Sequence, residues 1–120
     1  MAQLAREVVD AITPLLGEGT PPFALLGHSM GAWVVYEMAR ELRRRGGPMP
    51  RKLYVSGNRA PHLSGPPHDP DREAPSIAEL PEGEFWACFQ RRYGANPDLA
   101  SPAIRSYILP LLRADFRLVV

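Results

Sequence analysis

The feature that most constrains the fold of this sequence is a serine placed between an apolar run and a helical pattern. The apolar residues 23–26 come first, the pattern Gly-His-Ser-Met-Gly follows at 27–31, and apolar residues at helical spacing continue beyond it. This order predicts that Ser29 lies on a sharp turn from a strand into a helix, where the backbone angles are strained. A Cβ at Gly27 or Gly31 is expected to collide with the adjoining strand and helix, so both glycines are predicted structural residues of the turn.

The same turn predicts the chemistry of a serine nucleophile. The N-terminus of the following helix is expected to point at Ser29, which places the positive end of the helix dipole where an oxyanion would form. The backbone N–H of Met30 is then predicted to donate a hydrogen bond to that oxyanion. The alternative is a chance turn, since Gly-x-Ser-x-Gly also occurs in arbitrary sequences, but the flanking strand and helix favour the nucleophile.

The elements around this turn predict an α/β arrangement. Residues 2–16 are predicted to form a helix whose apolar face consists of Leu4, Val8, Ile12 and Leu15 or Leu16. Pro14 is expected to bend or break its last turn. The strand at 23–26 is followed by a second short strand at 52–55. The second strand is predicted to be buried and parallel to the first, because a helix of crossover length separates the two.

The crossover helix is predicted to pack against the sheet through Gly31, Val35, Met38, Ala39 and Leu42. Glu37 and Glu41 are expected on its wetter side, within pairing distance of arginines one turn away. Three arginines at 43–45 precede Gly46-Gly47, a pattern typical of a helix C-terminus. We interpret this basic run as a helix end rather than as a binding patch.

The second half of the chain predicts an irregular loop and then two helices. Residues 61–83 are rich in proline and show no periodicity, so we expect a loop and not a linker between domains. Aromatic residues recur at helical spacing from Phe85 to Tyr93. Ser101-Pro102 is a helix start, and Pro110 is expected to kink the helix that follows. Its predicted apolar stripe consists of Ile104, Ile108, Leu111 and Leu112.

Length and composition narrow the class of protein. A chain of 120 residues is at most one domain, and a net charge of +1 gives no argument for a nucleic-acid or membrane partner. The single cysteine, Cys88, cannot form an intramolecular disulfide, and no metal-ligand spacing is present. No apolar run is long enough to span a membrane, and the N-terminus lacks the pattern of a signal peptide. We therefore predict a cytoplasmic protein without a metal or cofactor.

Only two strands are predicted, and both have the apolar character of interior strands of a parallel sheet. Such a sheet is buried on both faces and needs neighbouring strands and covering helices. Two central strands and one crossover helix do not close a core at this size. The predicted fold class is therefore α/β with an incomplete sheet, and the sequence has the character of the middle of a larger domain.

Four stretches, taken together and in this order, resemble the type II thioesterases. These are stand-alone α/β-hydrolases that accompany fatty-acid, polyketide and nonribosomal peptide synthases. The resemblance covers residues 1–120, but only about the middle half of a family member. The stretches are Pro22-Phe23-Ala24-Leu25-Leu26-Gly27-His28-Ser29-Met30-Gly31-Ala32, Ser56-Gly57-Asn58-Arg59-Ala60-Pro61-His62, Tyr93-Gly94-Ala95-Asn96-Pro97 and Leu109-Pro110-Leu111-Leu112-Arg113-Ala114-Asp115-Phe116.

The resemblance implies hydrolysis of an acyl thioester on the phosphopantetheine arm of an acyl or peptidyl carrier protein, or on coenzyme A. Ser29 would attack the thioester carbonyl, Met30 N–H would hold the oxyanion, and water would then release the acid. Residues 81–116 would match the helical lid of the family. The candidates for lining its acyl channel are Phe85, Trp86, Phe89 and Ile108, with ordinary core packing as the alternative for such an aromatic stripe.

The sequence also departs from the family pattern. The glycine-rich loop that supplies the second oxyanion donor is missing, as are the acid and the histidine that follow the serine in chain order. His62 and His68 lie in the proline-rich loop, where a structural role is favoured over that of a base. Activity of these 120 residues alone is therefore not expected. The alternatives are another serine esterase or acyltransferase, or a non-catalytic module that keeps the contact with a carrier protein.

Overall fold

The structure of the chain is a computed structural model that describes residues 1–17, 19–60, 63 and 76–119. It divides into two compact units, Met1–Pro61 and His62–Val120. The elements of the first unit are α1 (Ala2–Ile12), the 3-10 helix η1 (Thr13–Leu15), β1 (Ala24–His28), α2 (Met30–Arg44) and β2 (Lys52–Ser56). Those of the second are the 3-10 helix η4 (Ile77–Glu79), α3 (Glu82–Tyr93), the 3-10 helix η5 (Pro97–Ala100) and α4 (Pro102–Val119).

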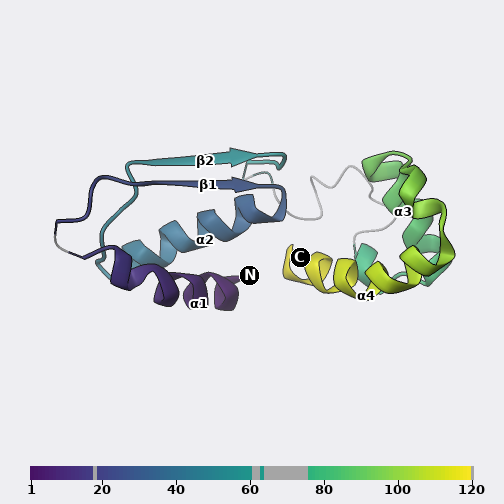
Figure 1. Cartoon of the computed structure of the whole chain (residues 1–120), viewed down its shortest axis with the longest axis horizontal. Coiled ribbons are helices and arrows are strands. Elements are labelled where there is room, and N and C mark those ends of the chain that lie inside the picture. The colour runs from purple at the N-terminus through teal and green to yellow at the C-terminus, as the bar shows by residue number, and fades with distance from the viewer. Residues whose placement is uncertain (18, 61–62, 64–75, 120) are drawn as a thin grey trace. The chain divides into compact units, whose positions relative to one another are not determined.

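The first unit is layered, with α2 between a two-stranded sheet and α1 (Figure 1). The strands β1 and β2 are parallel, in a register that pairs Ala24 with Lys52 and His28 with Ser56. The predicted parallel pairing across a crossover helix is therefore confirmed. Because the strands are parallel and in register, their carboxyl ends lie at the same edge of the sheet, next to the start of α2.

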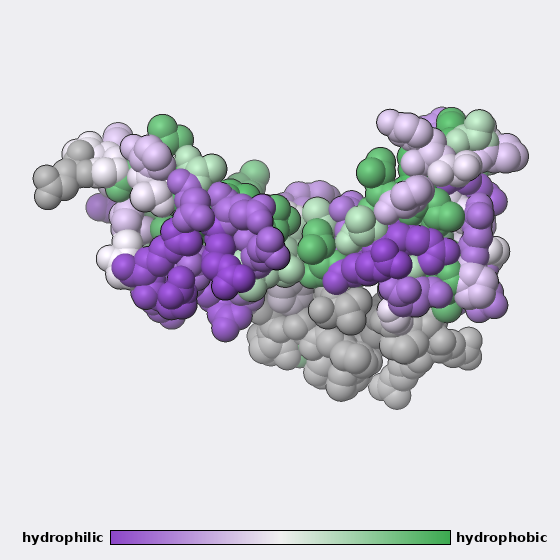
Figure 2. Space-filling model, turned by 90° about the horizontal axis from the view of Figure 1, so that it is seen from below, coloured by the Kyte–Doolittle hydropathy of each residue, from purple (hydrophilic) through white to green (hydrophobic). Residues whose placement is uncertain are grey.

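The core of the first unit lies where α1 meets α2. Val35, Met38 and Leu42 of α2 are buried here, as the helical spacing predicts, and Ala5 and Val9 of α1 pack against them. The face predicted for α1 is displaced, because Val8, Ile12 and Leu16 are only partly buried against this cluster and Leu15 is 71% exposed. Leu25 and Leu53 of the two strands pack against this cluster from the sheet. The outward side of α1 carries exposed polar residues, and Figure 2 views the hydrophilic surface that they form. These residues are Gln3, Arg6, Glu7 and Asp10.

The predicted burial of both strands is wrong for one face of the sheet. Leu25 and Gly27 point toward α2, whereas their neighbour Leu26 is 75% exposed and its cross-strand partner Tyr54 is 50% exposed. Successive side chains of a strand point to opposite faces. Among the described residues of the first unit, helices pack on one face of this sheet only, so the alternate residues stay exposed.

Helix ends in this unit follow the local sequence. Helix α1 stops at Ile12, and Pro14 lies in the 3-10 turn that follows, so the predicted break is confirmed. Helix α2 ends at a glycine cap, with Gly46 at a φ of 65°. The N–H of Gly46 donates to the carbonyl of Arg43, and that of Gly47 to the carbonyl of Leu42, which is the Schellman pattern. The basic run is thus part of a helix end.

Glu41 is more buried than predicted, since the sequence placed it on the solvent-facing side of α2. Its side chain is only 10% exposed, and its carboxylate accepts hydrogen bonds from Arg44 and Arg45 at 2.6–2.7 Å. Arg45 also pairs with Asp10, which ties the end of α2 to α1. The packing of α1 over this face explains the difference, because helical spacing alone does not show how far a second helix covers α2. The pair predicted between Glu37 and Arg40 is present.

Glu41 is expected to make the stability of the protein depend on pH. Hydrogen bonds from Arg44 and Arg45 lower the pKa of its carboxyl from its ordinary value near 4.5 to about 2. A lowered pKa stabilises the folded state above the ordinary value, and this stabilisation is lost as the pH falls through the folded-state pKa. The temperature at the midpoint of thermal unfolding should therefore decrease as the pH is lowered from about 4.5 to about 2.

The variant Glu41→Gln isolates this effect, because the lowered pKa of Glu79, which bonds Arg117, is the same in both proteins. The variant should be less stable than the parent at neutral pH, and the difference should shrink as the pH approaches 2. A difference that stays constant over this range would contradict the assignment.

The second unit has an aromatic core. Phe85, Trp86 and Cys88 of α3 are buried with Ile77 of η4, and Ile108 of α4 packs against them. Leu109, Leu112 and Phe116 complete the packed face of α4. The predicted stripe is thus half wrong, since Ile104 is 41% and Leu111 is 59% exposed. The apolar residues of α4 cover more than one helical face, so their spacing did not distinguish the packed face from the exposed one.

The remaining predictions for the second unit concern its loop and Pro110. Most of the predicted loop at 61–83, with His62, His68, Asp69 and Asp71, lies outside the described residues. Its last residues form η4 and the start of α3. Helix α4 contains Pro110 and continues beyond it to Val119. No helix in the described part of the chain combines the length and the hydrophobicity needed to cross a membrane.

Candidate active site

Ser29 lies on the turn between β1 and α2 in a conformation that L-residues rarely adopt. Its φ is 52° and its ψ is −122°, and among the described residues it alone has a positive φ without being a glycine. Such a conformation costs about 1–3 kcal/mol and persists only where the surroundings hold it. The sharp, strained strand-to-helix turn predicted from the sequence is therefore present. What the structure shows here is conformation; the role of Ser29 as a nucleophile stays a prediction.

The two glycines of the turn are not equivalent. A Cβ added at Gly27 would overlap the carbonyl group of Gly31 and would lie 2.7 Å from Cγ2 of Val35. The collision predicted for Gly27 is therefore present, against the start of α2. A Cβ added at Gly31 meets no described atom within 4 Å outside its own helix and chain neighbours. The collision predicted for Gly31 is wrong for the described residues, because its carbonyl faces Gly27 whereas the position of its Cβ is open.

Three hydrogen bonds hold the backbone of Ser29. Its N–H donates to the carbonyl of Ser56 at the end of β2, over 2.8 Å. Its carbonyl accepts from the N–H of Ala32 at 3.0 Å and from Nδ2 of Asn58 at 3.0 Å. Two of the three partners lie at the end of β2: Ser56 is its last residue, and Asn58 follows two residues later. The end of β2 therefore helps to hold the strained turn.

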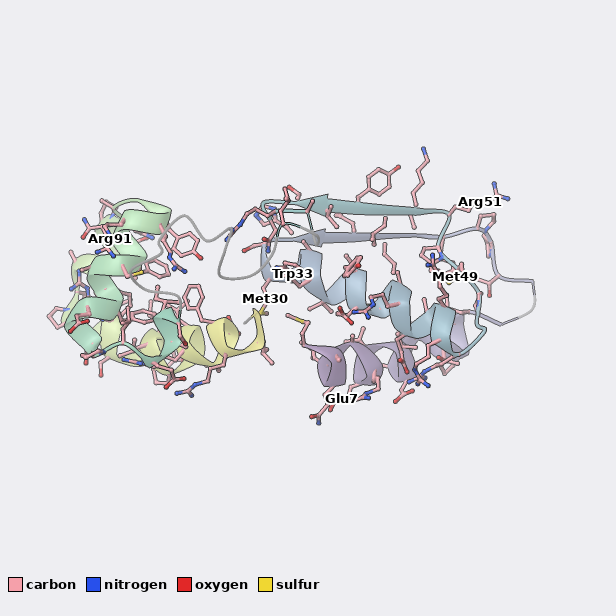
Figure 3. The ribbon with its side chains drawn as sticks, turned by 180° about the vertical axis from the view of Figure 1, so that it is seen from behind. Glu7, Met30, Trp33, Met49, Arg51 and Arg91 are labelled. Carbon is pink, nitrogen blue, oxygen red and sulfur yellow. The ribbon has the colours of Figure 1, made fainter. Side chains whose placement is uncertain are left out.

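Met30 is the first residue of α2, and its backbone N–H precedes the first N–H groups that bond within a helix. Figure 3 shows Met30 and Trp33 at the end of α2 that lies beside the strand ends, away from Met49 and Arg51 at the other end of the unit. The positive end of the α2 dipole thus lies at Ser29. This geometry suits an oxyanion, although the donor role of Met30 stays a prediction.

His28 is held against the end of β2. Its Nδ1 lies 3.1 Å from Oγ of Ser56. Its ring lies over Gly57, which has a φ of 64° and where an added Cβ would lie 2.6 Å from Cε1 of His28. Among the described residues no hydrogen bond joins a histidine to the Ser29 hydroxyl, and the described part holds no cluster of metal-binding side chains.

The four candidates for the acyl channel all belong to the core of the second unit. Phe85 has no exposed surface and Trp86 is 7% exposed, while Phe89 and Ile108 are half-buried against them. The rings of Phe85 and Trp86 meet edge to face at 5.1 Å between centroids. Burial of this kind favours the core alternative for Phe85 and Trp86. A channel role for any of the four stays a prediction, as does the lid role of residues 81–116.

Sequence reasoning missed Asn58 and Ser56 as residues that hold the turn. They entered only as part of a stretch that resembles the thioesterases. A physical signal was available, because parallel strands that are consecutive in the chain end at the same edge of a sheet. A polar residue just after β2 was therefore placed to reach the serine just after β1.

Comparison with known proteins identifies a family for this chain. The family model described as "Thioesterase domain" matches residues 1–120. The chain is 39% identical to the thioesterase PikA5 of Streptomyces venezuelae over 116 aligned residues. The alignment covers 96% of this chain and 38% of PikA5. The chain spans about two-fifths of the length of the curated relatives it matches.

Solved structures agree with the family match. RedJ, a thioesterase from the prodiginine biosynthetic pathway in Streptomyces coelicolor, matches with a TM-score of 0.77 and 40% identity, over 99% of this chain and 43% of that one. YbtT, a type II thioesterase from the yersiniabactin pathway, matches with a TM-score of 0.71 and 34% identity, over 96% of this chain and 43% of that one. The predicted fold class, part of an α/β-hydrolase fold, is confirmed.

Proposed function

Because this chain belongs to the thioesterase domain family and resembles its type II members, we propose that it supplies the nucleophile of an acyl-thioester hydrolase. The observation that carries the proposal is the conformation of Ser29, at a φ of 52° between β1 and the N-terminus of α2. A strained serine at a helix N-terminus is the arrangement by which α/β-hydrolases attack a carbonyl, because it presents the side chain beside amide dipoles.

The proposed acylation step begins with attack of the Ser29 Oγ on the thioester carbonyl. The carbonyl oxygen becomes an oxyanion, to which the N–H of Met30 donates a hydrogen bond. Collapse breaks the C–S bond, and the departing sulfur takes the proton that left Ser29, so the products are a free thiol and an acyl-serine. Water then adds its oxygen to the acyl carbon, the C–O bond to Ser29 breaks to release the carboxylic acid, and a proton from the water restores the Oγ hydroxyl.

A general base must carry that proton, and no described residue fills the role. His28 is the one histidine in the described part, and its Nδ1 faces Ser56 rather than the reacting hydroxyl. We therefore assign to this chain the nucleophile and an oxyanion donor, and not a complete catalytic triad.

The proposed substrates are acyl groups on the phosphopantetheine arm of an acyl or peptidyl carrier protein, or on coenzyme A. Support comes from relatives whose names place them in biosynthetic pathways, prodiginine for RedJ and a combined peptide and polyketide pathway for YbtT. Because such acyl chains are biosynthetic intermediates, the proposal includes a cytoplasmic location. Neither a metal nor a cofactor takes part in the proposed steps.

A fluorophosphonate probe tests the proposal in the protein as its gene encodes it. The probe should form an adduct on the peptide that contains Ser29, and prior incubation with an acyl-carrier thioester should slow the labelling, because both compete for one hydroxyl. Mass spectrometry locates the adduct. The matched control is Ser76→Ala, which removes a hydroxyl in the second unit and should leave labelling unchanged.

The outcomes separate the alternatives. An adduct on another residue would show that the nucleophile is misassigned. The absence of any adduct, with a folded protein that still binds an acyl carrier protein, would support the non-catalytic module instead.

A further inference from the structure

We propose that Asn58 is a positioning residue for the oxyanion hole, fixing the direction of the Met30 N–H through the carbonyl of Ser29. The inference rests on the proposed function, since it assigns a task to a residue beside the same site. Asn58 follows β2, and its Nδ2 lies 3.0 Å from the carbonyl oxygen of Ser29. Its two hydrogen bonds in the described structure involve neither the serine hydroxyl nor the N–H that it orients.

The argument depends on the planarity of the peptide group. The carbonyl of Ser29 and the N–H of Met30 belong to one peptide unit, whose atoms lie in a plane with the two groups pointing in opposite directions. A hydrogen bond that fixes the carbonyl therefore fixes the N–H as well. The N–H of Ala32 also donates to this carbonyl, but it lies in α2 and moves with the helix. Asn58 is the donor that comes from the sheet.

Both ends of the Asn58 carboxamide are engaged. While Nδ2 donates to Ser29, Oδ1 accepts from the backbone N–H of Arg59 at 2.8 Å. A rotated amide would place oxygen against the Ser29 carbonyl and donor against donor at Arg59, so the orientation is determined by its partners. The side chain, although exposed, thus links the segment after β2 to the peptide unit of the predicted oxyanion donor through two hydrogen bonds.

The link also strengthens the donor it orients. A hydrogen bond accepted at a carbonyl polarises its peptide group, which makes the N–H on the other side a better donor. An oxyanion hole works because its donors are fixed before charge develops, so a loose peptide loses part of the effect. The expected consequence of losing Asn58 is therefore a slower reaction, without weaker binding of the substrate.

The test compares Asn58→Asp with the parent in the protein as its gene encodes it. Aspartate keeps the shape and the acceptor for Arg59, but it has no N–H and places a charged oxygen against the Ser29 carbonyl. We expect kcat for a carrier-bound acyl thioester to fall about 10- to 100-fold, somewhat less than the loss of a whole oxyanion donor. KM should change by less than about 2-fold, since ground-state binding is untouched. Affinity for a boronic acid, which forms a tetrahedral adduct on serine, should fall with kcat.

Asn58→Ala should show the same division between kcat and KM, to a smaller degree, because it removes the donor without adding a charge. The matched control is Gln3→Glu, which removes an exposed amide that donates to Glu7 on α1. It should leave kcat unchanged while it perturbs stability by a comparable, small amount.

The results separate this inference from the proposed function. If fluorophosphonate labels Ser29 equally fast in the parent and in both Asn58 variants, Asn58 has no positioning role although the nucleophile stands. A rise in KM at constant kcat would also overturn the inference. If the parent itself is not labelled at Ser29, the proposed function fails and this inference fails with it.

Discussion

Replacing Ser29 with glycine is expected to abolish thioester hydrolysis and, at the same time, to stabilise the fold. The first effect follows from the loss of the proposed nucleophile, which in serine hydrolases lowers kcat by about 10⁴- to 10⁶-fold. The second follows from the backbone, since a φ of 52° with a ψ of −122° strains any L-residue but not glycine. A gain in stability on removal of a functional residue indicates that the native protein tolerates backbone strain at that residue because its function needs the strained conformation.

The size of the gain can be bounded by comparison with Ser29→Ala, which removes the same hydroxyl but keeps the Cβ. Relief of strain contributes about 1–3 kcal/mol, and the greater freedom of glycine in the unfolded chain takes back about 0.5–1 kcal/mol. The free energy of unfolding of Ser29→Gly should therefore be about 1 kcal/mol higher than that of Ser29→Ala. Urea unfolding of the two variants measures the difference, and hydrolysis of an acyl thioester measures the activity.

Two results would contradict this prediction, and they bear on different parts of it. Equal stability of the two variants would mean that residue 29 is not strained in solution. Retention of hydrolysis in either variant would mean that another side chain is the nucleophile.

The turn could be predicted from the sequence because its causes are local. A short apolar run, a serine between glycines and an amphipathic pattern specify a strand, a turn and a helix without reference to distant residues. The ends of the helices were predictable for the same reason, as Gly46 and Pro14 illustrate. Gly27 follows this rule as well, since a Cβ there would overlap the first turn of α2.

Burial could not be predicted in the same way, because it depends on which elements come to lie over a face. Tyr54 belongs to a strand with the character of an interior strand, yet half of its surface is exposed in the described structure. Glu41 shows the opposite error: its charge predicted exposure, but α1 packs beside it and two arginines neutralise it. Gly31 was judged by its place in a pattern, although the direction of its Cα–H bonds decides what a side chain would meet.

The part of the site that the sequence concealed is the support from β2. Asn58 lies 29 residues from Ser29 in the chain, and only the parallel register of β1 and β2 brings the two together. A strained residue needs external partners, because its own backbone energy favours another conformation. The N–H of Ser29 and its carbonyl find those partners at Ser56 and Asn58. The hydrogen bonds that stabilise the turn therefore also couple its geometry to the sheet.

The second large effect is expected at Gly27, where alanine should disrupt the turn. The added methyl group would overlap the Gly31 carbonyl and come within 2.7 Å of Val35, so either β1 or α2 must shift. Overpacking against a backbone atom has no flexible side chain to relieve it, and we expect a loss of about 3 kcal/mol of stability. A displacement of about 1 Å at Ser29 would also lower kcat for thioester hydrolysis about 100-fold.

Gly31→Ala is the matched control, since it adds the same methyl group four residues along the chain. There the methyl group meets no described atom within 4 Å, and alanine restricts the unfolded chain more than glycine does. This variant should therefore be more stable than the parent by about 0.4–1 kcal/mol and should retain its activity. Chemical unfolding and the rate of fluorophosphonate labelling measure both variants. Equal effects of the two substitutions would show that the glycines serve backbone flexibility in general, whereas opposite signs would show that close approach at Gly27 shapes the turn.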